Sequence, residues 1–150
     1  MKTLDDIHPG LVIGRYEFVA PIAKGGMAAV WAARVRGARG FQKLVAIKTI
    51  LSSLSELEVE RMFLDEARLV ARIRHPNVVE VLDLGEHDES LYLVMELIEG
   101  EALVVLNKAV ARQGKTIPMP IAVKILADAA RGLHAAHQLK DDNNQPLNLV

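Results

Sequence analysis

Residues 43–50 read KLVAIKTI, and this β-branched run decides the fold more than any other stretch of the chain. Valine, isoleucine and threonine favour extended backbone, so the run predicts a strand. Side chains alternate between the two faces of a strand, which places Ala46 and Lys48 together on one face. Val45 and Ile47 fall on the other face. The run therefore predicts a strand with one apolar face and a lysine beside a small residue on its other face.

The flanking sequence predicts a sheet with a helix packed on it. Between residues 43–50 and the next strand, apolar residues recur at three- and four-residue steps and predict a helix. This helix begins near the capping pair Ser55 and Glu58 and ends at His75-Pro76. We expect an α+β fold, a five-stranded antiparallel sheet with one packed helix followed by two more helices. The expected strands are 16–23, 28–36, 43–50, 78–84 and 91–98, and the two later helices are about 102–112 and 121–139, with the start of a further strand at 147–150.

Composition excludes several classes of protein. The 18 Lys and Arg residues balance 19 Asp and Glu residues, so neither nucleic acid nor an anionic membrane is an expected partner. No apolar run approaches the roughly 18 residues that span a bilayer, and the early acids Asp5 and Asp6 do not fit a signal peptide. The absence of cysteine makes the cytoplasm the expected location. No metal site is expected, because His134 and His137 lack a third ligand at a sensible spacing.

Four features, taken in chain order, are candidates for binding chemistry. The turn within residues 22–30 carries little side-chain bulk, so its backbone N–H groups can approach phosphate oxygens, although a plain hairpin is the alternative. Lys48 can reach a phosphate over a flat ring lying on Ala46, or it can simply extend into solvent. Glu66 can pair with Lys48 or remain a solvated charge. The strand 91–98 ends in open backbone that can bind an adenine edge, or it is an ordinary strand end.

The ordered set of features resembles the protein kinases, in particular the eukaryotic-like Ser/Thr kinases of bacteria. The resemblance runs from about Gly14 to the last residue and includes the His75-Pro76 entry to the fourth strand. It implies that Lys48 binds the α- and β-phosphates of ATP with Glu66 as its ion-pair partner. The implied domains are a lead-in segment at 1–15, the kinase N-lobe with its hinge at 16–98, and the first helices of an incomplete C-lobe at 99–150.

The resemblance also implies the contacts to the nucleotide. Val30 and Ala46 would enclose the adenine, Met95 would be the gatekeeper, and the Glu96 carbonyl and Ile98 amide would bond its edge. The glycine turn would cover the phosphates, with alanine at two positions where the family has glycine. The full implied set is Ile22, Ala23, Lys24, Gly25, Gly26, Val30, Ala46, Lys48, Met95, Glu96 and Ile98.

The family's His-Arg-Asp catalytic loop and its Asp-Phe-Gly metal motif do not occur in the 150 residues. Asp83-Leu84-Gly85 precedes the hinge and is interpreted as the end of a strand. The resemblance therefore implies the ATP-binding portion of a Ser/Thr kinase that is catalytically incomplete alone, with Mg²⁺ and a protein substrate only in a complete domain. The alternative is a non-catalytic, kinase-derived interaction or regulatory module, whose exposed apolar helices offer a face for self-association.

Overall fold

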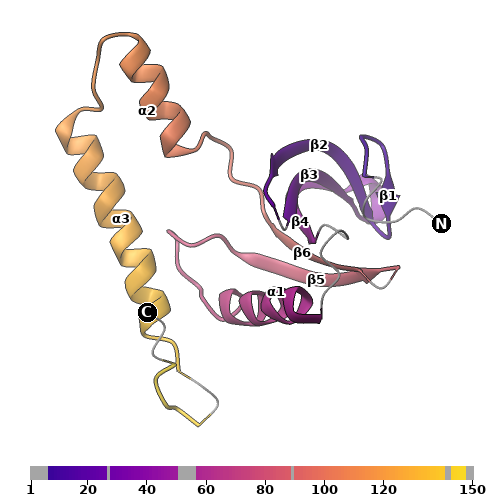
Figure 1. The fold of residues 1–150 in the computed structure, drawn as a ribbon. Coiled ribbons are helices and arrows are strands. Elements are labelled where there is room, and N and C mark those ends of the chain that lie inside the picture. The colour runs from indigo at the N-terminus through magenta and orange to yellow at the C-terminus, as the bar shows by residue number, and fades with distance from the viewer. Residues whose placement is uncertain (1–6, 27, 51–56, 89, 141–142, 148–150) are drawn as a thin grey trace. The chain divides into compact units, whose positions relative to one another are not determined.

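The computed structural model describes residues 7–26, 28–50, 57–88, 90–140 and 143–147 (Figure 1). The chain divides into two compact units. Unit 1 comprises Met1–Arg72 and Val79–Leu97, and unit 2 comprises Ile73–Val78 and Ile98–Val150. The predicted helix cap at Ser55 and most of the predicted strand at 147–150 lie outside the described residues.

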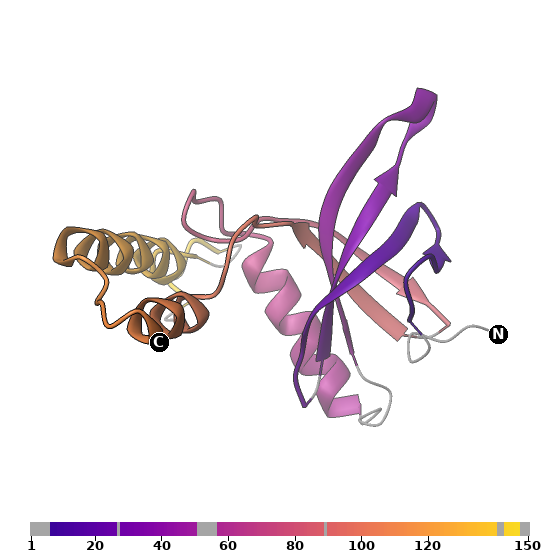
Figure 2. The ribbon, with the colours of Figure 1, turned by 90° about the horizontal axis from the view of Figure 1, so that it is seen from above.

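Unit 1 is built on a curled antiparallel sheet, which Figure 2 shows from above. A 3-10 turn at Ala38–Gly40 joins its third and fourth strands. The expected α+β fold is confirmed, but within the described residues the sheet has six strands where the sequence predicts five. In spatial order β1-β2-β3-β4-β6-β5, the strands are β1 (Val12–Ile13), β2 (Tyr16–Lys24), β3 (Ala28–Arg36), β4 (Gln42–Ile50), β6 (Ser90–Glu96) and β5 (Val81–His87).

The additional strand, β1, lies in the segment predicted as a lead-in. Its Ile13 pairs with Tyr16 of β2, and both Ile13 and the preceding Leu11 are buried in the core of the sheet. Gly10 and Gly14 flank the strand with φ of 88° and 56°, a region that glycine enters without strain. A strand of two residues is too short to show a hydrophobic period, which explains why the sequence pattern does not predict it.

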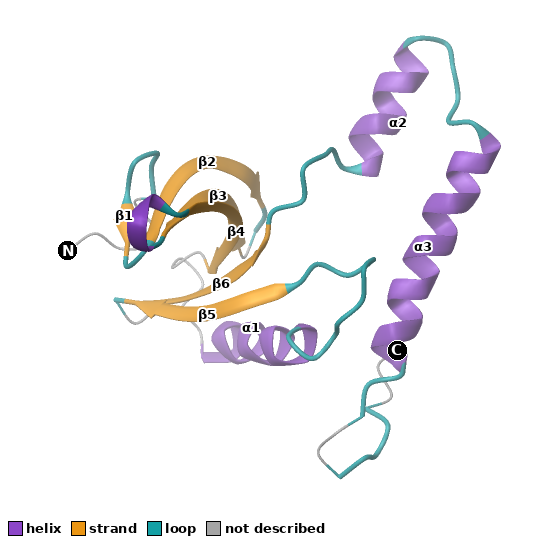
Figure 3. Ribbon diagram, turned by 180° about the vertical axis from the view of Figure 1, so that it is seen from behind, coloured by secondary structure: helices purple, strands orange, loops and turns teal. Residues whose placement is uncertain are grey.

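Strand β4 lies at the centre of unit 1, with apolar packing on both of its faces. Val45 and Ile47 point into a core enclosed by the curled sheet. Helix α1 (Leu57–Val70) covers part of the other face, where its Phe63 packs with Leu93 of β6. Figure 3 shows α1 running alongside β5 and β6. The enclosed core contains Leu11, Ile13, Tyr16, Phe18, Ala33, Val45, Ile47, Tyr92 and Val94.

Three polar side chains connect β2 with the edge strand β5, and we call this cluster, Arg15, Tyr16 and Asp83, the edge latch. The Tyr16 hydroxyl donates to Asp83 Oδ2 at 2.9 Å, and Arg15 donates to the Tyr16 oxygen at 3.1 Å and to Asp83 at 3.2 Å. The Tyr92 ring meets Tyr16 edge-on and covers Gly85, where an added Cβ would lie 2.2 Å from a ring carbon. Asp83-Leu84-Gly85 lies inside β5, which continues to His87, and this corrects its interpretation as the end of a strand.

Unit 2 contains the helices α2 (Leu103–Arg112) and α3 (Met119–His137), with Pro120 in the first turn of α3. Its residues 73–78 pack closely on α3, because a Cβ added to Gly132 would lie 2.8 Å from the Asn77 carbonyl oxygen. Helix α1 ends at Val70, earlier than the predicted end at His75-Pro76. Among the described residues, no helix combines the length and apolar character needed to cross a bilayer.

The edge latch predicts a loss of stability at alkaline pH. Burial, followed by the hydrogen bond to Asp83, raises the pKa of the Tyr16 phenol above its ordinary value near 10, although the Arg15 contact acts in the lowering direction. A raised pKa means that the folded state holds the proton more tightly than the unfolded state. The stabilisation is complete below about pH 10 and is lost as the pH rises through the folded pKa.

We expect Tyr16→Phe to reduce this alkaline loss when urea unfolding is measured between pH 8 and pH 11. Tyr92, whose pKa burial also raises, remains in the variant and supplies the residual slope. Equal pH slopes for the two proteins would contradict the assignment to Tyr16.

Candidate functional site

An ion pair between β4 and α1 is the central feature of the site. Lys48 Nζ donates to Glu66 Oε1 at 2.7 Å and to Oε2 at 2.8 Å. The Lys48 side chain is 23% exposed and that of Glu66 is 52% exposed, so the pair is accessible from solvent. An ammonium carries three N–H donors, and this arrangement directs two of them to one carboxylate. One donor and part of the positive charge therefore remain for an anionic ligand.

Phe63 adds a contact that the sequence analysis does not predict. The Lys48 ammonium lies 5.7 Å from the centre of the Phe63 ring, within the range of a cation–π attraction. Phe63 precedes Glu66 by three residues, so the two side chains share one face of α1. This spacing is a signal in the sequence that could have identified Phe63. The ring and the carboxylate together restrict the positions that the ammonium adopts.

The strand register gathers other predicted residues on the face of the sheet that carries Lys48. Val30 is the cross-strand partner of Lys48, and Ala46 is the partner of Met95. Partners across an antiparallel pair point to the same face, as do residues two apart on one strand. The structure therefore brings Val30, Ala46, Met95, Lys48 and Glu66 to one face. Among them Ala46 is nearly buried and contributes only a methyl group, which leaves a flat ring room to approach.

The glycine turn connects β2 and β3, next to Val30. Ala23 and Lys24 end β2 in register with Val30 and Ala29, and Ile22 is half exposed. The Gly25 N–H closes the turn by donating to the Ala28 carbonyl at 2.8 Å. A Cβ added to Gly26 would meet no atom within 4 Å, so this glycine leaves open space above the backbone. Because Ala23 is an extended strand residue, its Cβ causes no backbone strain.

The predicted hinge residues, Glu96 and Ile98, lie where β6 ends. Ile98 is 60% exposed, and within the described part of the chain its N–H donates to no backbone carbonyl. Glu96 is bonded twice to Glu80: its own N–H donates to the Glu80 carbonyl at 3.0 Å, and its Oε1 accepts from the Glu80 N–H at 2.9 Å. Ile98 belongs to unit 2, whereas the other predicted site residues belong to unit 1.

The described residues of this arrangement do not form a metal centre. The described residues place no group of three or more histidine, aspartate or glutamate side chains close enough to hold one ion. The site as described consists of one oriented ammonium, a small apolar surface and open backbone. That combination suits a ligand with a negatively charged group and a flat ring.

Comparison with known proteins identifies relatives of the chain. A family model described as "Protein kinase domain" matches residues 16–140. The "Tyrosine-protein kinase MasK" of Myxococcus xanthus is 40% identical over 154 residues, covering 99% of this chain and 24% of MasK. The "Serine/threonine-protein kinase PknA" of Mycobacterium tuberculosis is 37% identical over 130 residues, covering 83% of this chain and 28% of PknA. The chain thus spans about a quarter of the length of these relatives.

Solved structures agree with these relatives. The crystal structure of the Mycobacterium tuberculosis PknI kinase domain superimposes with a TM-score of 0.68 at 26% sequence identity. The match covers 88% of this chain and 52% of the PknI chain. A third relative, the "Probable serine/threonine-protein kinase CPE1738" of Clostridium perfringens, is 35% identical over 131 residues, which are 86% of this chain and 18% of CPE1738.

The exposure of the ion pair predicts that it contributes little to folding. An accessible pair contributes about 0–1 kcal/mol, because water screens both charges. We expect Lys48→Met and Glu66→Gln each to change the free energy of unfolding in urea by less than about 1 kcal/mol. Phe63→Ala, which empties a buried position on the same helix, should cost about 3–5 kcal/mol. A loss of several kcal/mol in Lys48→Met would show instead that the pair is needed for the fold.

Proposed function

The chain belongs to the protein kinase family, and from this premise we propose that it is the ATP-binding portion of a bacterial-type Ser/Thr protein kinase. In the whole protein, the reaction would transfer the γ-phosphate of ATP to a hydroxyl group of a protein substrate. We assign residues 16–98 to the smaller lobe and its hinge, and residues 99–150 to the first helices of the larger lobe. The observation that carries the proposal is the ion pair of Lys48 with Glu66 beside the small side chain of Ala46.

The residues of the site fit ATP in three respects. Lys48 is oriented by Glu66 and keeps a donor for the α- and β-phosphates. Ala46 and Val30 present small apolar surfaces on the same face, where the adenine ring would lie. The Ile98 N–H has no backbone acceptor among the described residues and is available to the adenine edge. ATP supplies the transferable phosphoryl group, and these residues bind and orient it.

The exposed glycine turn supports the phosphate end of the same site. Residues 22–26 combine open backbone with the cation Lys24, and a backbone free of bulky side chains lets N–H groups approach phosphate oxygens. Ile22, half exposed at the end of β2, would cover the nucleotide from the side of this turn.

The catalytic step requires groups beyond this set. Phosphoryl transfer in kinases depends on Mg²⁺ and on an aspartate at the attacking hydroxyl. The 150 residues contain no His-Arg-Asp and no Asp-Phe-Gly sequence, and we assign no magnesium ligand to the described residues. We therefore propose that this chain alone binds the nucleotide and does not transfer its phosphate.

The choice of serine and threonine over tyrosine rests on the relatives. PknA and CPE1738 carry serine/threonine kinase names, and MasK carries a tyrosine kinase name. We propose serine and threonine because two of these three relatives, PknA and CPE1738, carry that specificity in their names. Phosphoamino acid analysis of a substrate treated with the whole protein tests this choice, and phosphotyrosine as the main product would overturn it.

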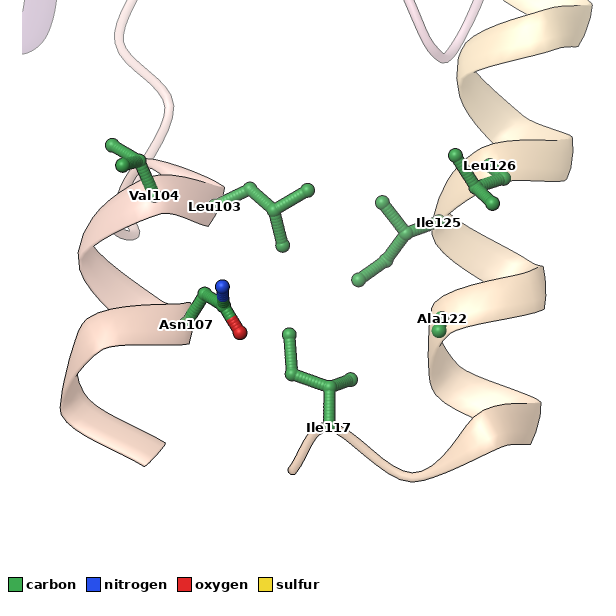
Figure 4. A pocket seen from close by; sticks show the side chains of 7 residues that line it. All are labelled: Leu103, Val104, Asn107, Ile117, Ala122, Ile125 and Leu126. Atoms are coloured by element: carbon green, nitrogen blue, oxygen red, sulfur yellow. The ribbon is translucent and has the colours of Figure 1, made fainter. Parts of the chain in front are cut away.

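A second candidate is an interaction or regulatory module, and an apolar pocket in unit 2 favours it. This pocket, of about 430 Å³, lies between α2 and α3 (Figure 4). The half-exposed Leu103 points into it from α2, and Ile125 points into it from α3. Sedimentation that depends on protein concentration would support self-association of this surface. The lining residues are Leu103, Val104, Asn107, Ile117, Ala122, Ile125 and Leu126.

Binding of a fluorescent ATP analogue tests the first candidate directly. We expect the chain to bind the analogue and Lys48→Ala to weaken binding at least about tenfold, because a charge-assisted phosphate contact is removed. Lys43→Ala is a matched control, since this exposed lysine lies on the same strand outside the proposed site. Equal affinities of the chain and Lys48→Ala would remove Lys48 from the site.

Incubation with radiolabelled ATP and Mg²⁺ tests whether the chain alone is inactive. We expect no incorporation of phosphate into the chain, because its residues include no catalytic aspartate of the family type. Robust incorporation that disappears in Lys48→Ala would contradict this expectation.

A further inference from the structure

Glu96 and Glu80 are joined by two hydrogen bonds, which we call the hinge clamp. One of these bonds uses the Glu96 side chain, for which the resemblance to kinases implies no role. The role that the resemblance implies for Glu96 uses only its backbone. Here the Glu96 carboxylate also accepts the Glu80 N–H at 2.9 Å, while the Glu96 N–H donates to the Glu80 carbonyl at 3.0 Å. Both backbone polar groups of Glu80, its N–H and its C=O, are therefore bound by a single residue.

The clamp reinforces the sheet where its ladder is irregular. Strands β5 and β6 pair regularly from His87 to Asp83, but the register shifts between Asp83 and Val81. Such a bulge leaves local backbone groups without ladder partners. Glu80 immediately precedes Val81, the first residue of β5, and the carboxylate of Glu96 provides the acceptor that the Glu80 N–H requires.

The side chain of Glu96 points away from the proposed nucleotide. Glu96 is the cross-strand partner of Val45, whereas Met95 is the partner of Ala46. Val45 faces the enclosed core and Ala46 faces the side with Lys48, so the Glu96 carboxylate lies on the face opposite Lys48. Any effect of this carboxylate on the nucleotide must therefore act through the backbone.

Both residues of the clamp lie in unit 1, and each is close in sequence to a point at which the chain passes between the units. The chain leaves unit 2 after Val78 and leaves unit 1 after Leu97. Glu80 follows the first point by two residues, and Glu96 precedes the second. Within unit 2, residues 73–78 are held on α3 by the close approach of Asn77 to Gly132. The Glu80 peptide is thus a short distance along the chain from an anchored segment.

We propose that the Glu96 carboxylate is a positioning group for the adenine-binding backbone. By holding the backbone of Glu80, it fixes the end of β6, the strand from which the chain continues into Leu97 and Ile98. The inference rests on the proposed function, because only a bound adenine gives this backbone a ligand. It adds a role for a side chain that does not contact the nucleotide.

The test compares four variants of the 150-residue chain, Lys48→Ala and three substitutions of carboxylates. Glu96→Ala removes the acceptor, Glu96→Gln keeps an oxygen that can accept the Glu80 N–H, and Glu86→Ala removes an exposed carboxylate of the same charge from β5. The measurements are amide hydrogen exchange at Glu80 and Ile98 by NMR and the affinities for adenosine and for ATP. Adenosine has no phosphate, so it reports on the hinge separately from Lys48.

In Glu96→Ala we expect the Glu80 N–H to exchange at least about tenfold faster, because it loses its acceptor. We expect the affinities for adenosine and for ATP both to fall roughly five- to tenfold, as for loss of a charge-assisted hydrogen bond. Glu96→Gln, which keeps an acceptor oxygen but loses the charge, should restore part of the protection and affinity lost in Glu96→Ala, and Glu86→Ala should behave like the unmodified chain. Lys48→Ala should weaken ATP but not adenosine, which separates positioning at the hinge from binding at the phosphates.

Two results would overturn the inference, and they differ from failure of the proposed function. Unchanged exchange in Glu96→Ala would show that the clamp does not order the hinge. Faster exchange with unchanged adenosine affinity would show that the clamp orders the backbone without positioning the ligand. If the unmodified chain bound neither adenosine nor ATP, the proposed function would fail, and the positioning role would fail with it.

Discussion

Unit 1 depends on one constraint: strand β4 must be packed on both faces while keeping one polar side chain accessible. Val45 and Ile47 are essentially inaccessible in the enclosed core, and Ala46 is nearly buried on the opposite face. Lys48 shares the face of Ala46 but extends toward Glu66 on α1, so the charge stays partly in water instead of in the core. The same register that buries the apolar residues therefore also places the ammonium. A shift by one residue would exchange the two faces and put the lysine into the core.

The parts of this architecture that follow from local patterns could be predicted from the sequence. The β-branched run at 43–50, the glycine turn and the helix period each involve neighbouring residues, and the resemblance to kinases supplied their arrangement. The two-residue strand β1 could not be predicted, because its identity depends on pairing with β2. Helix α1 ends at Val70, two residues before the chain passes from unit 1 into unit 2 at the buried Ile73. Proline at position 76 limits a helix but does not determine where within the preceding turns it ends.

Some residues of the candidate site could be predicted from the sequence, and others could not. Lys48 and Glu66 were expected to pair, and the structure contains that pair, while the nucleotide roles of the site remain proposals. Phe63 was missed although its spacing from Glu66 was visible, because a phenylalanine on an amphipathic helix is ordinarily a core residue. The hinge clamp could not be inferred, since it joins a side chain to a backbone group 16 residues away beside an irregular ladder. A contact between a side chain and a distant backbone group produces no periodic pattern of residues in the sequence.

The edge latch has a consequence for the behaviour of the chain in concentrated solution. Strand β5 is an edge of the sheet, and exposed strand edges are templates for the addition of strands from other molecules. Asp83 lies in the middle of this edge, where its Oδ2 accepts from Tyr16 and its Oδ1 accepts the Leu84 N–H. The Asp83 carboxylate thus accepts a backbone N–H that an added strand would need as a donor, and it places a negative charge at the edge where that strand would pair. In a chain with 51% apolar residues, such protection against intermolecular β-pairing favours solubility over aggregation.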